Sequence, residues 1–275
     1  MKFDSPRRVS VVIIAQDEQS RIANAVRSCE AFADEIVVID GGSQDDTVLV
    51  ARDLGCKVFV NRWPGYASQR NFGADRASHG WIFFIDADEV VGKDLATELS
   101  RWKKQADTKE AYAVYRVGDF FDKRITDGYF VRLYDKRMLR VKEVLVHESV
   151  ETEPAKTGQF TGVLWHYGFQ SVNDHVARFN KYTDLEAQKA HLENRRFSLL
   201  RLLLRPPARF AHRYLLQKLY KQGMAGLTVA VLWSYYEFVR EAKLYEIYWR
   251  EGMGMQELSE VGRTPLHKEC ERRKN

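Results

Sequence analysis

The chain of 275 residues is 45% hydrophobic and 29% charged, so we expect a packed core over most of its length and exclude a disordered chain. Its three cysteines, Cys29, Cys56 and Cys270, are far apart and lack C-x-x-C spacing, which argues against a disulfide framework or a zinc site and fits a reducing, cytosolic setting. The formal net charge of +5 admits polyanionic partners but does not choose among them.

The first hundred residues alternate β-branched apolar runs with segments of helical spacing. Strands are predicted at 9–14, 35–40, 56–61 and 81–85, and helices at 20–32, 47–54 and 68–77. Near-continuous apolar runs are typical of parallel strands covered on both faces, and their alternation with helices predicts βαβ units. We therefore expect an α/β fold with a mainly parallel sheet flanked by helices.

The pattern changes in the second half of the chain. Between residues 111 and 163, segments such as AYAVYRV and YFVRLYD predict antiparallel strands added to the sheet edge. After Ser171 the spacing predicts a helical C-terminal extension, in which Pro206-Pro207 should end or kink a helix. We expect no signal peptide at the start, and no stretch reaches the roughly 18 to 20 apolar residues that cross a bilayer.

A segment rich in arginine and leucine, RRFSLLRLLLRPPARFAHRYLLQKLYKQ, begins at Arg195. Its leucines have helical spacing, and the arginines expected on another face are Arg201, Arg205, Arg209 and Arg213. Such a basic amphipathic helix lies naturally in the interface of an anionic membrane. The alternative is a helical pair that packs on the rest of the chain with its arginines solvated. Nucleic acid is not expected as a partner, because no nucleic-acid motif accompanies the charge.

Polar side chains follow three of the four predicted strands. They are Gln16-Asp17-Glu18, Asp40-Gly41-Gly42 and Asp86-Ala87-Asp88-Glu89. Ligands bind beyond the carboxyl ends of strands in open α/β sheets, so we expect these acids to surround one crevice. Asp86 and Asp88 suit a hard cation, Mg²⁺ or Mn²⁺, that bridges carboxylates to substrate phosphates. A lone D-x-D also fits solvated acids that cap a helix.

Three ordered motifs, VSVVIIAQDE, EIVVIDGGSQDDT and GYASQRNFGADRASHGWIFFIDADE, resemble the nucleotide-binding half of the family 2 glycosyltransferases of the GT-A, Rossmann-like fold. The continuation RLYDK, VHESV and LWHYGFQSVNDHVARFNKY is similar to the subgroup that glycosylates the lipopolysaccharide inner core. The resemblance implies a catalytic domain at 1–170, with a nucleotide-sugar half at about 1–105 and an acceptor half at about 106–170. Residues 171–275 would then form the helical, membrane-associating region.

The same resemblance implies roles for individual residues. The implied donor-binding residues are Ala15, Asp17, Glu18, Asp40, Gly42, Arg70, Asn71, Asp86, Ala87 and Arg132. Asp40 would bind the base, expected to be uracil, while Arg70 and Asn71 would flank the nucleotide and diphosphate. For Arg70 and Asn71 the alternative is an exposed helix arginine with an asparagine cap. Arg132 could bind phosphate or pair with Asp135.

The remaining implied roles concern the metal and the chemistry. The implied metal ligands are Asp88, Asp86 and His147, and His166 is a further candidate for a metal or phosphate contact. Either histidine could instead be structural. Glu148 is the expected general base, which would deprotonate the acceptor hydroxyl and give inversion at the anomeric carbon.

The resemblance thus predicts an inverting enzyme that uses Mn²⁺ or Mg²⁺ and moves a hexose from a UDP-sugar, with UDP-glucose expected, to a lipid-linked saccharide such as the lipopolysaccharide inner core. It would lie in the cytoplasm against the inner face of the cytoplasmic membrane. One alternative is a nucleotidyltransferase, although residues 15–21 lack the glycine-rich, basic loop of that class. Another is a non-catalytic protein that binds nucleotide sugars or acts as a membrane scaffold.

Overall fold

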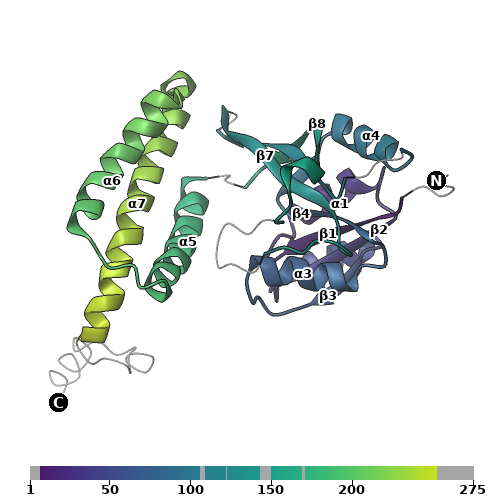
Figure 1. Cartoon of the computed structure of the whole chain (residues 1–275), viewed down its shortest axis with the longest axis horizontal. Helices are drawn as coiled ribbons and strands as arrows, with labels where there is room; N and C mark the ends of the chain where they lie inside the picture. The colour runs from purple at the N-terminus through teal and green to yellow at the C-terminus, as the bar shows by residue number, and fades with distance from the viewer. Residues whose placement is uncertain (1–6, 106–108, 122, 143–149, 169–170, 253–275) are drawn as a thin grey trace, which may run out of the picture.

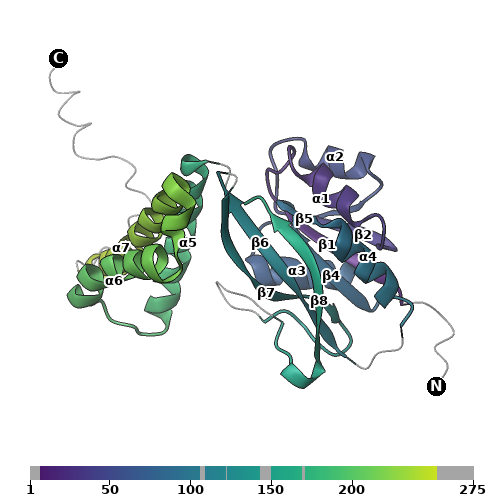
Figure 2. The same ribbon diagram turned by 90° about the horizontal axis from the view of Figure 1, so that it is seen from above.

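The structure is a computed structural model that describes residues 7–105, 109–121, 123–142, 150–168 and 171–252. It shows a sheet with helices packed against it and, beside this, a group of long helices formed by the later part of the chain (Figure 1). Seen from above, the long helices lie beside the end of the sheet where β6 (Ala111–Phe120) is followed by β7 (Lys123–Asp135) (Figure 2).

One sheet contains all the named strands. They are β1 (Val9–Ala15), β2 (Glu35–Asp40), β3 (Lys57–Val60), β4 (Trp81–Asp86), β5 (Glu89–Val91), β6 (Ala111–Phe120), β7 (Lys123–Asp135) and β8 (Thr157–His166). The order is β3-β2-β1-β4-β7-β6-β8-β5, and the half formed by β3, β2, β1 and β4 is parallel throughout. The predicted α/β fold with a mixed, mainly parallel sheet is therefore confirmed.

Helices cover both faces of the sheet. They are α1 (Ile22–Cys29), α2 (Thr47–Asp53), α3 (Tyr66–Arg76) and α4 (Lys93–Trp102). Along β1, Val11 and Ile13 pack in one core with residues of α1 and α4, while Val12 packs in the other core with residues of α3. This alternation is the period of two that a strand imposes on its side chains. A Cβ at Gly73 would lie 2.4 Å from Cγ1 of Val12, so glycine is required where α3 meets β1.

The second half of the sheet mixes strand directions. AYAVYRV lies in β6 and YFVRLYD in β7, and these strands pair antiparallel as predicted, as do β7 and β4. The strand β8 is parallel to β6 and antiparallel to β5. The sequence pattern did not indicate β5, which has only three residues and follows Asp88 directly. It lies beside His166 of β8, and this pairing brings His166 next to the D-x-D motif.

The helical part of the chain begins after β8. It comprises α5 (Val172–Leu192), α6 (Leu199–Ala211), the π-helical turn η2 (His212–Leu216), the 3-10 turn η3 (Leu219–Gln222) and α7 (Gly223–Gly252), while a further 3-10 turn, η1 (Pro154–Lys156), precedes β8. Of the two outcomes predicted for Pro206-Pro207, the end of a helix is wrong, because α6 runs through both prolines, and the kink stays a prediction. Proline keeps a helical φ but lacks the N–H group that would donate to the carbonyl one turn earlier. The hydroxyl of Ser234 in α7 donates to the carbonyl oxygen of Pro206 at 2.8 Å and so links this part of α6 to α7. Within the described ranges, no helix has both the length and the apolar character to span a membrane.

Candidate active site

The carboxyl ends of β1, β2 and β4 meet at one edge of the sheet. Ile14 of β1 is in register with Asp86 of β4, and the next residue, Ala15, is in register with Asp40 of β2. Strands are spaced by about 4.8 Å, so Asp40 and Asp86 flank the end of β1 at roughly 10 Å from each other. Strand alternation directs Asp86 toward the face covered by α3 and Asp40 toward the face covered by α1 and α2. The two acids therefore lie at one edge of the sheet with β1 between them, and the single crevice expected around them stays a prediction.

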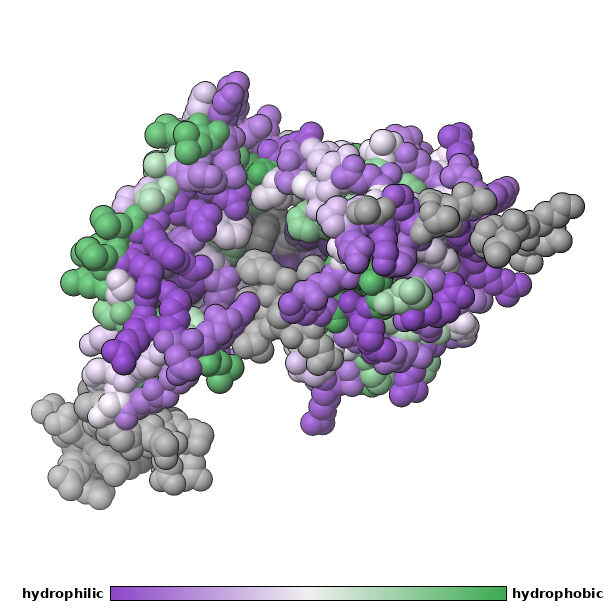
Figure 3. Space-filling view, in the orientation of Figure 1, coloured by the Kyte–Doolittle hydropathy of each residue, from purple (hydrophilic) through white to green (hydrophobic). Residues whose placement is uncertain are grey.

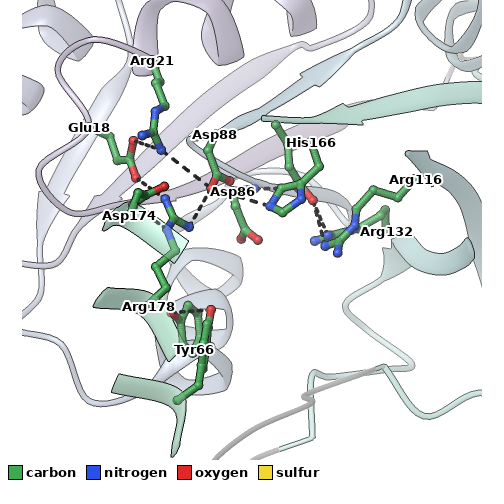
Figure 4. A network of polar contacts seen from close by, with 12 residues as sticks. Glu18, Arg21, Tyr66, Asp86, Asp88, Arg116, Arg132, His166, Asp174 and Arg178 are labelled. Carbon is green, nitrogen blue, oxygen red and sulfur yellow. Dashed lines mark hydrogen bonds and ion pairs between the residues drawn. The ribbon is translucent and has the colours of Figure 1, made fainter. Parts of the chain in front are cut away.

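Asp88 lies at the centre of a network of charged side chains (Figure 4). Its Oδ2 is 2.9 Å from Nη1 of Arg178, 3.7 Å from Nε2 of His166 and 4.0 Å from Nη1 of Arg21. Burial opposes ionisation of Asp88, but the hydrogen bond from His166 and the charge of Arg178 outweigh it and hold the pKa below its usual range. Asp88 is therefore a buried carboxylate that stays ionised at neutral pH.

Asp86 is bound by Arg70, which the family resemblance implied to lie beside the nucleotide. Nη2 of Arg70 lies 2.7 Å from Oδ1 of Asp86, and the guanidinium stacks over the ring of Phe84. Burial raises the pKa of Asp86, but the charges of Arg70 and Arg132 lower it further than burial raises it. Arg70 is buried, so the alternative of an exposed helix arginine is wrong.

Glu89 organises the residues around the D-x-D motif. Its fully buried carboxylate lies 2.6 Å from Nη2 of Arg132 and 3.3 Å from Nη1 of Arg116, and it accepts a 2.9 Å hydrogen bond from the backbone N–H of Asp86. The partner of Arg132 is thus Glu89 rather than Asp135. Sequence analysis counted Glu89 among the acids expected around the crevice but gave it no individual role.

Helix α5 contributes to this network from outside the sheet. Arg178 binds Asp88, is 3.8 Å from Oε1 of Glu18, and is positioned by Asp174 one turn earlier at 3.3 Å. One turn later, the hydroxyl of Tyr182 is 3.0 Å from the hydroxyl of Tyr66 in α3. The sequence analysis missed Arg178 and Tyr182. The available signal was the polar i, i+4, i+8 series Asp174, Arg178 and Tyr182 on a predicted helix.

The loops that follow β1 and β2 are bound to each other. Both oxygens of Asp40 accept hydrogen bonds from its own turn, from the backbone N–H groups of Gly42 and Ser43 and from the Ser43 hydroxyl, at 2.5 to 3.0 Å. Asp17 has a left-handed φ of 55° and accepts a 2.7 Å hydrogen bond from the N–H of Gln44. In this structure Asp40 and Asp17 shape the loops in which the base was predicted to bind.

Glu18 adjoins these loops on the side of Asp88. Its backbone N–H donates to Oγ1 of Thr47 at 2.8 Å, and its carboxylate is 3.3 Å from Nη1 of Arg21. Burial is the main cause that raises the pKa of Glu18 to about 7; the charge of Arg21 opposes this shift and that of Asp88 adds to it.

Asn71 is buried and anchors a neighbouring segment instead of facing the crevice. Its side chain donates to the carbonyl of Val141 at 2.9 Å and accepts from the N–H of Val141 at 3.1 Å. Val141 in turn forms an isolated bridge with Val150. His147 and Glu148 lie between these two residues but outside the described part of the chain, so their roles stay predictions. Ala87, also predicted at the site, is buried and donates its N–H to the carbonyl of Ile14 at 3.2 Å.

The predicted metal site can be tested on the side chains present. Among the described residues no group of three His, Cys, Asp or Glu side chains is arranged to hold a metal ion. Asp88 and His166 do form a pair, and a Cβ at Gly168 would lie 2.4 Å from Nε2 of His166 and 3.3 Å from Oδ2 of Asp88. Mg²⁺ is commonly bound through one or two protein carboxylates and completes its shell with substrate phosphates and water. The pair therefore fits a cation that arrives with a diphosphate.

The four arginines predicted to contact a membrane differ in their surroundings. Arg201 and Arg209 bind Glu241 and Glu237 of α7, and Arg213 stacks over Trp233 with 4.4 Å from its guanidinium carbon to the ring centroid. Arg205 is exposed.

Comparisons with known proteins identify relatives over most of the chain. The sequence model of the family described as glycosyl transferase family 2 matches residues 10–151. An uncharacterised glycosyltransferase of Rickettsia typhi is 27% identical over 88% of this chain and 88% of its own length. The lipopolysaccharide core biosynthesis glycosyltransferase LpsC of Rhizobium meliloti is 28% identical over 86% of this chain and 92% of its own length.

Solved structures give a weaker likeness. Glucosyl-3-phosphoglycerate synthase from Mycobacterium tuberculosis, in complex with Mn²⁺, uridine diphosphate and glucosyl-3-phosphoglycerate, is 23% identical, with a TM-score of 0.36. The alignment covers 40% of this chain and 44% of the synthase. A TM-score this low carries no weight for the ligands of the present chain.

Proposed function

The chain belongs to the family 2 glycosyltransferases, and we propose that it transfers a hexose from a UDP-sugar to a lipid-linked saccharide with inversion at the anomeric carbon. The proposed donor is UDP-glucose, and the proposed acceptor is the inner core of lipopolysaccharide. The similarity to LpsC over most of both chains supports this class of acceptor. Residues 1–170 would form the catalytic domain, and residues 171–275 would hold it against the inner face of the cytoplasmic membrane.

The observation that carries the proposal is the network around Asp88. An ionised carboxylate and an imidazole lie side by side at the carboxyl edge of a parallel sheet, and arginines from separate elements surround them. A diphosphate bound through a divalent cation presents positive charge to carboxylates and negative charge to arginines. The network offers both kinds of partner within one site.

The proposed cation, Mn²⁺ or Mg²⁺, would be held by Asp88 and His166, with Asp86 beside them, and would supply Lewis-acid neutralisation of the leaving diphosphate. When the donor binds, Arg178 would release Asp88 and bind a phosphate oxygen instead. As the acceptor hydroxyl oxygen bonds to the anomeric carbon, the bond from that carbon to the diphosphate breaks. The hydroxyl proton passes to the general base, for which Glu148 remains the proposed residue.

The test is the variant Asp88→Asn, which keeps the shape of the side chain and removes its charge. We expect its transfer rate from UDP-glucose, in the presence of Mn²⁺, to fall by at least about 10³-fold. The measurement is release of UDP from the purified protein with an acceptor lipid. The matched control, Asp75→Asn, removes an exposed carboxylate of α3 that pairs with Arg140.

A panel of UDP-sugars in the same assay would identify the donor. Transfer by Asp88→Asn at the wild-type rate would reject the cation site, and UDP release unaffected by a chelator would reject the metal. Absence of UDP release by the wild-type protein from every sugar in the panel would favour a non-catalytic binding protein.

A further inference from the structure

In an ordinary pair of helices in water, each helix buries its apolar side and exposes its charged side. The amphipathic helix α6 does the reverse. Its inner side, toward α7, carries arginines that bind buried glutamates. Nε of Arg201 lies 3.1 Å from Glu241, and Nη2 of Arg209 lies 2.5 Å from Glu237. Both glutamates are almost fully buried. The charges of these arginines are therefore neutralised within the protein.

The outer side of α6 and η2 is apolar. We call it the leucine face, and its members are Leu199, Leu200, Leu203, Leu204, Leu215 and Leu216. Each of these side chains is between 57% and 74% exposed. Hydrophobic residues gather on the side of the molecule occupied by α6 in the space-filling view (Figure 3). Contiguous exposed apolar surface of this kind marks a contact site with a partner or a membrane.

The charge of the surrounding sequence distinguishes between possible occupants. From residue 194 to residue 236 the chain contains no aspartate or glutamate, and it contains eight arginines and lysines. Of these, Arg205, Lys218 and Lys221 are exposed, and Lys218 and Lys221 follow Leu215 and Leu216 closely in the chain. A second copy of the chain would bring two positive surfaces together, which is unfavourable. An anionic bilayer would meet the apolar side chains with acyl chains and the basic side chains with headgroup charge.

We propose that the leucine face is the surface by which this protein docks on an anionic lipid bilayer. The leucines enter the interface, and Lys218 and Lys221 contact the headgroups. Arg201 and Arg209 act as internal ties that hold α6 on α7 in the orientation that exposes the leucines. The docking surface is inferred from the orientation of α6, which is independent of any catalytic role. The inference rests on the proposed function only where it links docking to a lipid-linked acceptor.

The test is sedimentation of the full chain with phosphatidylcholine vesicles that contain or lack phosphatidylglycerol. We expect the wild-type protein to bind the anionic vesicles, and Leu203→Asp/Leu204→Asp to bind them at least about tenfold more weakly. The matched control is Leu49→Asp in α2, because Leu49 is 56% exposed and lies outside the leucine face. Its binding should equal that of the wild type.

A second variant, Leu215→Ser/Leu216→Ser, repeats the test at η2, and circular dichroism checks that each variant is folded. Hydrolysis of UDP-glucose in solution should be unchanged in both leucine variants, and this readout separates docking from catalysis. If wild-type turnover is absent but vesicle binding depends on the leucines, the proposed function fails and the docking surface stands.

Two results would overturn the inference. One is vesicle binding that is equal in the wild type and in both leucine variants. The other is a dimer, measured by light scattering, that the leucine substitutions convert to a monomer without any change in vesicle binding, which would assign the leucine face to a second copy of the chain.

Discussion

The sheet and the pair formed by α6 and α7 distribute their apolar and charged residues in opposite ways. The sheet buries aliphatic side chains between helices on both faces and places its carboxylates and arginines at one edge. The helical pair buries Glu237 and Glu241, which bind partly exposed arginines, and exposes leucines. In the sheet, burial of apolar surface drives folding, while the helical pair is held together largely by charge-assisted hydrogen bonds. The location of the apolar side chains thus indicates that the sheet region is suited to water and the outer side of the helical pair to a lipid bilayer.

The substitution with the largest expected effect, Glu241→Ala, tests whether ion pairs hold α6 on α7. Glu241 is fully buried and binds Arg195 at 2.8 Å and Arg201 at 3.1 Å. Glu241→Ala leaves two arginines without their partner, so we expect the free energy of unfolding of this region to fall by about 3 to 5 kcal/mol. Urea denaturation followed by tryptophan fluorescence measures it.

The control for that prediction is Glu246→Ala, which removes an exposed glutamate paired with Arg250 on the same helix. Its effect should stay below about 0.5 kcal/mol. Equal effects of the two substitutions would show that the buried ion pairs do not hold α6 on α7.

A smaller effect is expected where α5 meets the sheet. His175 is almost fully buried between Phe120 of β6 and Phe179, and burial lowers its pKa from the ordinary 6.5 to about 4. The unfolded chain therefore binds more protons than the folded chain between these values, and stability is lost as the pH falls from 6.5 toward 4. We expect a loss of up to about 3 kcal/mol from this residue.

The measurement is a series of denaturant titrations between pH 7 and pH 4. His175→Gln cannot be protonated, so its stability should depend less on pH than that of the wild type. His212→Gln changes an exposed histidine and serves as the control. An unaltered pH profile for His175→Gln would mean that other groups cause the acid sensitivity.

The smallest effect concerns Arg178, through which α5 contacts the carboxylates at the sheet edge. Arg178→Ala frees Asp88 from its guanidinium partner, so Mn²⁺ alone should bind more tightly. The complex of Mn²⁺ with UDP should bind about tenfold more weakly, because a phosphate contact is lost. Calorimetry with UDP and electron paramagnetic resonance of free Mn²⁺ measure the two effects, with Arg250→Ala as the control. A change of both affinities in the same direction would contradict the proposed exchange.

The sequence predicted the parallel half of the sheet because its strands are continuous apolar runs that end in carboxylates. It also predicted that the acids following β1, β2 and β4 would surround one crevice. In the structure they lie at one edge of the sheet, with Asp40 and Asp86 directed to opposite faces. The sequence left open whether a helix ends or kinks at Pro206-Pro207, and in the structure α6 runs through both residues. It did not predict Arg178, whose role depends on how α5 packs against the sheet.

The sequence pattern of α6 also left its orientation open. Leucines at helical spacing with arginines on another face are compatible with either side being buried. Only the buried partners Glu237 and Glu241, which lie 28 positions after Arg209 and 40 positions after Arg201, decide that the arginines face inward.

The reach of α5 into the charged network has a practical consequence for dissecting this protein. Arg178 and Tyr182 both contact residues of the sheet region, yet both precede the docking helix in the chain. A truncation placed before α5 would remove an arginine from the carboxylate of Asp88 together with the lipid-binding surface. An inactive truncated protein would then report an incomplete donor site and would say nothing about whether catalysis requires a membrane.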